Sequence, residues 1–435
     1  MLVDLQQLRA RINRLSTEIA VQEDVLKKLE QEKSLAQRQL NGVLDPLARL
    51  PVEISLDIFR YCLPPVPWRT PMESDAAHGF PLQLLNICNT WTDIALSDSS
   101  LWASIQIIFP CSEGYRELLK VWLRRAGNHP LSISLCNPSE IDFATAGIVW
   151  GHGKQLKHLE IYNDAENEDQ DSDSGEPIGF DQPIDLFGGK EPESLPSLET
   201  LIIGRATYCP PYFALQILEL LRRAPNLVEC IFARVPLVGD SDTAEKLVLP
   251  NLRRLIFEEL PRYSNDDKIL KHLSLPALET LSLPMRLSDD DLLSFLKRSS
   301  PPLQELSIGH GGRCPDSCLR LIPTLTQFGG RLSLPVVEGF FDALAESPSL
   351  LPNLRSLFVR PTYDTIPDSF WRQLFRAASA RRNRGERESP NFHVKLRWGL
   401  EPSEMPTDIV AKFGNLDGVS ISLSATNEPE WKHTF

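Results

Sequence analysis

The residues best suited to hold a metal ion are His310, Cys314 and Cys318. Imidazole and thiolate groups are the ligands that zinc prefers in proteins. A structural zinc site needs four such ligands, and no second pair of cysteines or histidines at ligand spacing accompanies these three. The sequence therefore favours an ordinary loop, and we expect no metal site.

A second fragment with potential chemistry is Gly151-His152-Gly153-Lys154. It suggests a phosphate-binding loop, but the long glycine spacing and the Ser or Thr after the lysine are missing, so it predicts a turn before a strand. Serine-nucleophile and zinc-protease motifs are absent, and carboxylates such as Asp142 and Asp185 form no recognisable acid–base pair. We expect a binding protein without a cofactor rather than an enzyme, with an unrecognised hydrolase as a minor alternative.

Negative charge is concentrated in one segment, residues 164–193. The chain carries a formal net charge of −13. This segment holds eleven acidic residues and a single basic one, Lys190, so it contributes −10 and leaves −3 for the rest. Such a composition is typical of a solvated, disordered loop, which we place at residues 163–194. Strong acidity also repels phosphate backbones and disfavours nucleic acid as a general partner.

Cysteine usage and hydropathy indicate an intracellular protein, cytoplasmic or nuclear. The eight cysteines are scattered singly rather than at the density of a disulfide scaffold. No stretch approaches about 18 consecutive apolar residues, so we expect no membrane span. The first residues lack a basic flank followed by an apolar signal region. The Asn-x-Ser match at Asn137 is blocked by Pro138.

Residues 1–41 have the pattern of one long amphipathic helix. With Leu5 as position a of a heptad, apolar side chains recur at alternating spacings of three and four over five heptads, as in a coiled-coil seam. Gln22 and Lys33 interrupt the seam, where polar residues reduce stability but can fix the register. Two interpretations stay open: a homodimer through residues 1–40, or a helix that packs against the rest of its own chain.

Residues 45–103 predict a small all-helical domain. Pro51 stands where a helix should begin, and apolar residues follow it at intervals of four. A proline-rich insertion at residues 64–81 interrupts the helices, and a second helical pattern begins at Leu84. These patterns carry more apolar surface than a unit of this size can bury alone, so we expect a partner to cover it.

The third section, residues 104–435, contains a repeat. Each copy reads Pro-x-Leu-x-x-Leu followed by further apolar residues, and helical patterns lie between copies. The leading leucines are separated by 29, 25, 26, 25, 22 and 29 residues, within the range of leucine-rich repeats. We therefore predict an α/β protein in which a strand and a helix from each copy stack into an irregular solenoid. The copies begin at Pro196, Pro225, Pro250, Pro276, Pro301, Pro323 and Pro352.

Strand alternation predicts a binding surface on these repeats. The two leucines of each copy should face inward, so that the residue after the second leucine faces outward. In three consecutive copies this residue is an isoleucine: Ile202, Ile231 and Ile256. One interpretation is a substrate groove rimmed by Glu229 and Arg254, and the other is a stripe covered by a neighbouring loop or by the N-terminal helix.

Two segments of the helical section resemble the F-box motif. Its first half is similar to Leu50-Pro51-Val52-Glu53-Ile54 with Ile58-Phe59 behind it. Its second half is similar to Ile87-Cys88-Asn89-Thr90-Trp91, followed by Ile94-Ala95 and Leu101-Trp102. The order of coiled coil, F-box and irregular repeats resembles fungal F-box-like proteins. The chain departs from the family in its long proline-rich insertion, in Asn89 and Thr92 where basic residues are common, and in repeats that lack the asparagine of typical leucine-rich repeats.

The resemblance implies a substrate-recognition adaptor of an SCF-type E3 ubiquitin ligase. The helical domain would dock on a Skp-type adaptor and, through it, on a cullin, while the repeats would hold a protein substrate that the sequence does not name. The alternative is a scaffold of coiled coil and leucine-rich repeats that binds partners without a ubiquitin function. Carried over by position, the adaptor-binding residues are Leu50, Pro51, Ile54, Ile58, Leu84, Ile87 and Trp91.

Overall fold

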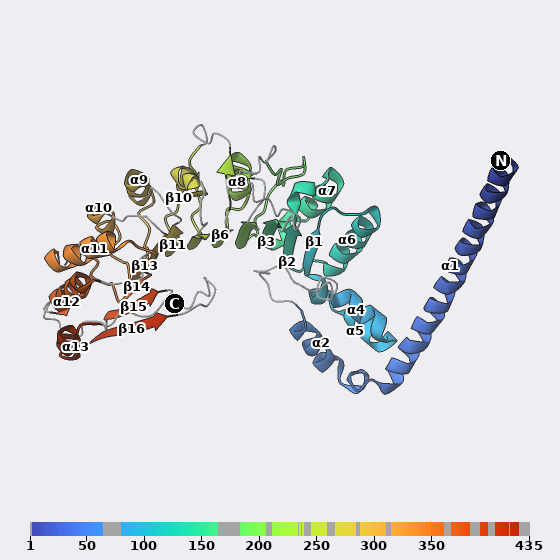
Figure 1. Ribbon diagram of the computed structural model, residues 1–435, viewed down its shortest axis with the longest axis horizontal. Coiled ribbons are helices and arrows are strands. Elements are labelled where there is room, and N and C mark those ends of the chain that lie inside the picture. The colour runs from blue at the N-terminus through green and yellow to red at the C-terminus, as the bar shows by residue number, and fades with distance from the viewer. Residues whose placement is uncertain are drawn as a thin grey trace. The chain divides into compact units, whose positions relative to one another are not determined.

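The chain divides into two compact units in the computed structural model (Figure 1). The N-terminal unit contains Met1–Ile105 and Glu117–His129, and the C-terminal unit contains Gln106–Arg116 and Pro130–Phe435. The structure describes residues 2–63, 80–163, 183–205, 211–233, 235, 237–238, 245–258, 266–283, 288–309, 315–347, 349–360, 367–382, 392–398, 405–416 and 418–425.

The N-terminal unit begins with the long helix α1, Leu2–Leu44. The helix contains no proline, and its first glycine is Gly42, so no residue before that point breaks it. The predicted long N-terminal helix is thereby confirmed. At about 1.5 Å per residue it is roughly 65 Å long.

The remaining helices of this unit are short. They are η1 (Leu47–Arg49), α2 (Val52–Tyr61), α4 (Phe80–Ile87), α5 (Asn89–Ser97), η2 (Ser99–Trp102) and the larger part of α6 (Glu113–Ala126). The predicted insertion ran to residue 81, but α4 begins at Phe80 and takes Pro81 into its first turn, where the missing N–H costs no hydrogen bond. Residues 64–79 of that insertion lie outside the described residues.

The C-terminal unit is built on a twelve-stranded sheet in the order β1-β2-β3-β4-β6-β9-β11-β12-β13-β14-β15-β16. From β2 to β16 every neighbouring pair is parallel. The predicted mixed α/β class is confirmed, with this large parallel sheet as its main element. The strands are β1 Ser104–Ile108, β2 Leu131–Cys136, β3 Leu156–Asn163, β4 Thr200–Arg205, β6 Glu229–Ala233, β9 Arg254–Glu258, β11 Thr280–Leu283, β12 Glu305–Ile308, β13 Gln327–Gly330, β14 Ser356–Val359, β15 Phe392–Trp398 and β16 Val419–Ala425.

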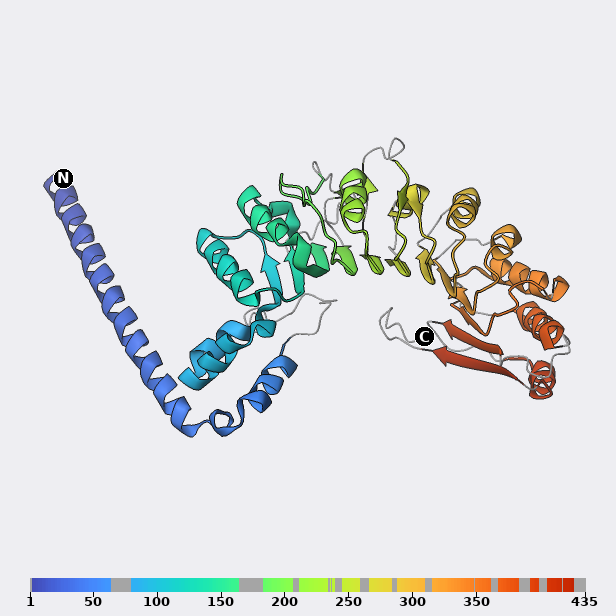
Figure 2. The ribbon, with the colours of Figure 1, turned by 180° about the vertical axis from the view of Figure 1, so that it is seen from behind.

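Helices connect many of these strands, and α8, α9, α11 and α12 lie on one side of the sheet (Figure 2). Two small parallel ladders join neighbouring connections. One pairs β5 (Tyr212–Phe213) with β7 (Leu237–Val238), and the other pairs β8 (Leu247–Val248) with β10 (Leu273–Ser274). The helical segments are η3 Pro138–Glu140, α7 Phe143–Gly151, η4 Gly153–Gln155, α8 Ala214–Arg223, η5 Asp266–His272, α9 Asp289–Ser299, α10 Asp316–Leu319, α11 Leu334–Glu346, α12 Asp368–Arg382 and α13 Thr407–Gly414.

The sequence repeat explains the register of the sheet. The second apolar position of each copy pairs with the same position of the next, as in Leu201 with Cys230 and Cys230 with Leu255. Side chains in this row point to the same face, where they form the core beneath the helices. Each is at most 3% exposed: Leu201, Cys230, Leu255, Leu281, Leu306, Phe328 and Leu357.

The acidic segment differs in part from its prediction as a disordered loop. Residues 164–182 lie outside the described residues, but residues 183–193 are described, and they pack. Ile184, Leu186 and Phe187 are buried, and the indole N–H of Trp150 donates to the carbonyl of Phe187 at 3.3 Å. The prediction of disorder rested on the number of charged residues in the segment and gave no weight to these apolar residues. They anchor the end of the segment in the core.

Candidate functional site

Helix α2 has one face in the core and one in solvent. Pro51 precedes its first residue, and Ser55 and Phe59, four residues apart, are buried. Around the start of the helix aliphatic groups are exposed: Leu50 is 41% exposed and Ile54 48%. Leu50 and Pro51, just before the helix, and Val52 and Ile54, in its first turn, are all exposed, and we call this set the α2 apolar face.

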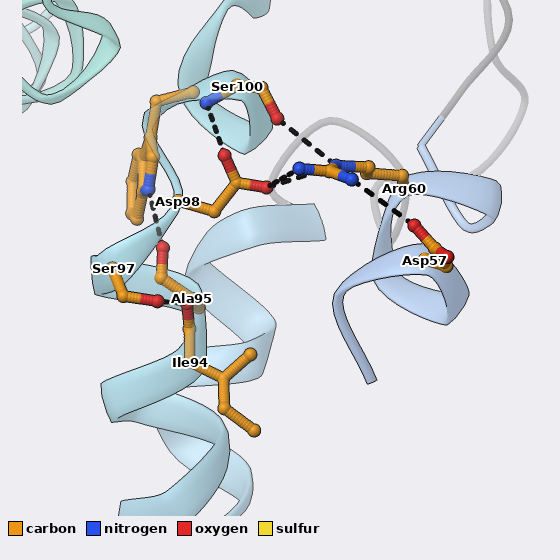
Figure 3. Close-up of polar contacts among 8 residues, drawn as sticks. Asp57, Arg60, Ile94, Ala95, Ser97, Asp98 and Ser100 are labelled. Atoms are coloured by element: carbon orange, nitrogen blue, oxygen red, sulfur yellow. Dashed lines mark hydrogen bonds and ion pairs between the residues drawn. The ribbon is translucent and has the colours of Figure 1, made fainter. Parts of the chain in front are cut away.

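A half-exposed ion-pair network links α2 to the turn that follows α5 (Figure 3). The guanidinium of Arg60 lies 2.9 Å from a carboxylate oxygen of Asp98, and its Nη1 donates to Asp57 at 3.2 Å. Asp98 also accepts the backbone N–H of Ser100 at 2.9 Å, which caps η2. Burial alone would raise the pKa of Asp98, but the hydrogen bonds from Ser100 and the charge of Arg60 hold it below its usual value. The carboxylate thus stays ionised and keeps α2 in place.

Aromatic packing supports the same arrangement from inside the unit. Phe59 of α2 meets Trp91 of α5 with ring centroids 4.9 Å apart. The indole N–H of Trp102 donates to the carbonyl of Ala95 at 2.9 Å, and that of Trp122 donates to the carbonyl of Trp102 at 2.9 Å. These bonds satisfy the polar ends of two buried rings, so the core specifies one packing.

The seven predicted adaptor-binding residues fall into three groups. Leu50, Pro51 and Ile54 are exposed. Leu84 is 2% exposed and belongs to the core of the unit. The other three, Ile58, Ile87 and Trp91, are half-buried. The exposed apolar surface therefore belongs to residues 50–54, whereas residues 84–91 contribute more to the core of the unit.

Helix α1 is held to α4 and α5 by polar contacts that the sequence interpretation missed. Arg38 donates to the side chains of Asn89 at 3.2 Å and Thr92 at 3.0 Å. Asn41 donates to the carbonyl of Ile87 at 3.0 Å. Asn89 and Thr92 thus act as acceptors for an arginine of α1.

The predicted substrate stripe is not an open groove. Ile202, Ile231 and Ile256 lie side by side in the register of β4, β6 and β9, as expected, but they are only 7%, 4% and 1% exposed. Together they form a buried apolar cluster. Strand alternation gives the face to which a side chain points but does not give its exposure, which depends on what lies over that face.

The two predicted rim residues of that stripe do lie beside it. Arg254 and Glu229 occupy paired positions of β9 and β6, and their side chains approach to 3.4 Å. The arginine side chain is 45% exposed, so this ion pair is a solvated contact of small energetic value. The pair flanks the isoleucine cluster without opening it.

The remaining candidate groups are the possible metal ligands and the glycine-containing fragment. Among these residues no cluster of three or more His, Cys, Asp or Glu side chains could hold a metal ion. Cys318 is buried in α10, whereas His310 and Cys314 lie outside the described residues. Gly153 and Lys154 form the short helical turn η4 before β3, which agrees with the predicted turn. In the described part of the chain, no helix combines the length and apolar character needed to cross a membrane.

Comparison with known proteins adds no assignment. No protein-family model matches the chain, and no curated protein is detectably similar to it.

Proposed function

We propose that the protein is the substrate-recognition adaptor of an SCF-type ubiquitin ligase, and that the α2 apolar face docks on a Skp-type adaptor. The observation that carries this proposal is a set of exposed aliphatic side chains around the first turn of α2, a helix that contacts α5 and the turn after it. Leu50, Val52 and Ile54 are 41%, 44% and 48% exposed, although the core of their own unit is closed. The residues are also those that open the motif resembling an F-box.

This face can supply part of the energy that specific binding needs. Full burial of an aliphatic side chain contributes about 1.5–3 kcal/mol, so roughly 1 kcal/mol per residue is still to be gained here. The Arg60–Asp98 ion pair and the Phe59–Trp91 contact hold α2 before a partner arrives. A face that is already ordered loses little conformational entropy on binding.

The C-terminal unit would hold the substrate. We interpret its sequential parallel strands and connecting helices as an irregular leucine-rich-repeat-like solenoid, with consecutive copies pairing side by side. The buried isoleucine cluster, Ile202, Ile231 and Ile256, would not form the surface that contacts the substrate. The protein would contribute proximity and orientation, while transfer of ubiquitin belongs to other subunits.

The second candidate function is a scaffold that binds partners without ubiquitin chemistry. The exposed seam of α1 favours it, because an uncovered apolar stripe is an interaction surface in its own right. The two functions differ in one requirement: the scaffold does not need the α2 apolar face.

A single substitution tests that requirement. We expect Ile54→Asp to weaken adaptor binding by about 2–4 kcal/mol, because a buried anchor would become a desolvated charge. The measurement is recovery of a Skp-type adaptor co-expressed with the tagged chain. Val410→Asp is the matched control, since Val410 is also on a helix and is 52% exposed.

Recovery should be lost with Ile54→Asp and unchanged with Val410→Asp, while circular dichroism shows both chains folded. Equal recovery with both variants would exclude docking through the α2 apolar face and leave the scaffold function.

A further inference from the structure

The seam of α1 is uncovered along most of the helix. Its a and d side chains are exposed to solvent from Leu8 onward, although this pattern belongs to a buried coiled-coil interface. A helix in water gains most of its stability from packing its apolar face, so an unpaired stripe of this length calls for a partner. The exposed side chains are Leu8 (51%), Ile12 (61%), Leu15 (49%), Ile19 (57%), Leu26 (57%) and Leu29 (57%).

We propose that α1 pairs with α1 of a second copy of this chain in an antiparallel two-stranded coiled coil, in the register that places Ile12 opposite Leu29 of the other copy. In this register the paired a and d layers run from residue 5 to residue 36 of each helix. The proposal is independent of adaptor binding, because it uses a different surface.

The polar residues of the seam decide the orientation. In a parallel pair each seam residue meets its own copy, so Lys33 would face Lys33 and Gln22 would face Gln22. Two ammonium groups at one seam layer repel each other. In the antiparallel register Lys33 faces Leu8, along which its methylene stem can lie while its charge reaches water, and Gln22 faces Ile19.

The charged side chains beside the seam also favour the antiparallel orientation. An antiparallel pair brings e positions opposite e positions and g opposite g. Arg9 then meets Glu30, Arg11 meets Glu32, and two-fold symmetry makes each contact twice. A parallel pair instead brings Glu18 against Glu23 and leaves both Arg11 and Glu32 opposite uncharged residues.

The same charges select one register among the antiparallel ones. Sliding one helix by a heptad in one direction places Glu18 opposite its own copy. Sliding it in the other direction places Glu18 opposite Glu32 and Glu23 opposite its own copy. Like charges at these positions destabilise the pair, so the register with Ile12 opposite Leu29 is preferred.

A second copy fits this helix better than an unrelated partner. The first part of the seam is flanked by arginines and the later part by glutamates, so the helix is complementary in charge to itself when reversed. The paired a and d layers end at residue 36, and Arg38 and Asn41, whose side chains hold α1 to α4 and α5, are at outward f and b positions. Pairing therefore leaves the contacts within each copy unchanged.

Charge reversal in the full chain provides the first test. Arg11→Glu turns two attractive contacts into two repulsive ones, and we expect the dimer dissociation constant to rise roughly tenfold at low salt. Glu32→Arg should do the same, and the double variant should restore dimerisation. Arg14→Glu, at an outward c position, is the control with the same change in charge, and it should have little effect.

Sedimentation equilibrium measures these constants. Rescue by the double variant supports the proposed register. A wild-type chain that is monomeric at all concentrations would overturn the proposal, as would a double variant no better than the single ones.

Cysteine cross-linking tests the orientation directly. Chains with Ile12→Cys and with Leu29→Cys, carrying different tags, are mixed and oxidised, and the linked peptides are identified by mass spectrometry. We expect the peptide of residue 12 linked to that of residue 29. Cross-linking of residue 12 to its own copy in the Ile12→Cys chain alone would show a parallel pair and overturn the proposal.

Discussion

Replacing Ile256 by serine should lower the free energy of unfolding of the C-terminal unit by about 3–5 kcal/mol. Ile256 is 1% exposed and lies between Ile231 and Ser282 in the sheet, so the substitution removes a buried aliphatic group and buries a hydroxyl. Ile256→Val removes a single methyl group and should cost only about 0.5–1.5 kcal/mol. Chemical denaturation of the full chain measures both.

The control for this substitution is Val248→Ser, because Val248 lies on the nearby strand β8 and is 56% exposed. We expect a change within about 0.5 kcal/mol there. If Ile256→Ser were equally harmless, the isoleucine cluster would be an accessible surface, and the substrate groove predicted from strand alternation would return as the better interpretation.

Phe187→Ala should also cost about 3–5 kcal/mol, because it leaves a cavity in the packed end of the acidic segment. The phenyl ring of Phe187 is 3% exposed and lies edge-on to Trp150, with centroids 6.2 Å apart. Phe143→Ala is the matched control, since this phenylalanine is 64% exposed. Thermal unfolding followed by circular dichroism compares the two.

A large fall in melting temperature for Phe187→Ala alone would establish that residues 183–193 belong to the folded core. Equal melting temperatures for the two variants would mean that the whole acidic segment is dispensable, as its charge suggests.

The parts of the fold that follow from periodic patterns of apolar side chains were predictable from the sequence. The Pro-x-Leu-x-x-Leu copies identified most strands, and the spacing of their leucines agrees with the observed register, in which Leu255 pairs with Leu281 and Leu281 with Leu306. The heptad pattern identified α1. In each case one short local rule is repeated along the chain, so that errors at single residues do not accumulate.

Exposure and long-range polar contacts were less predictable. The register that places Ile202 beside Ile231 was predictable, but local alternation carries no information on what covers these side chains. Arg38 reaches residues more than fifty positions away in the sequence, and no motif marks that contact. Phe187 was concealed by the acidic residues around it, because an average over the segment hides a few apolar anchors.

The central claim is that the α2 apolar face binds a Skp-type adaptor, and calorimetric titration of the purified full-length chain with the purified adaptor tests it most directly. We predict saturable binding of one adaptor per chain, with a negative heat-capacity change from the burial of Leu50, Val52 and Ile54. Ile54→Asp should weaken this binding by roughly 30-fold or more. A folded wild-type chain that gives no binding heat at two temperatures, and that does not co-elute with the adaptor, would contradict the claim.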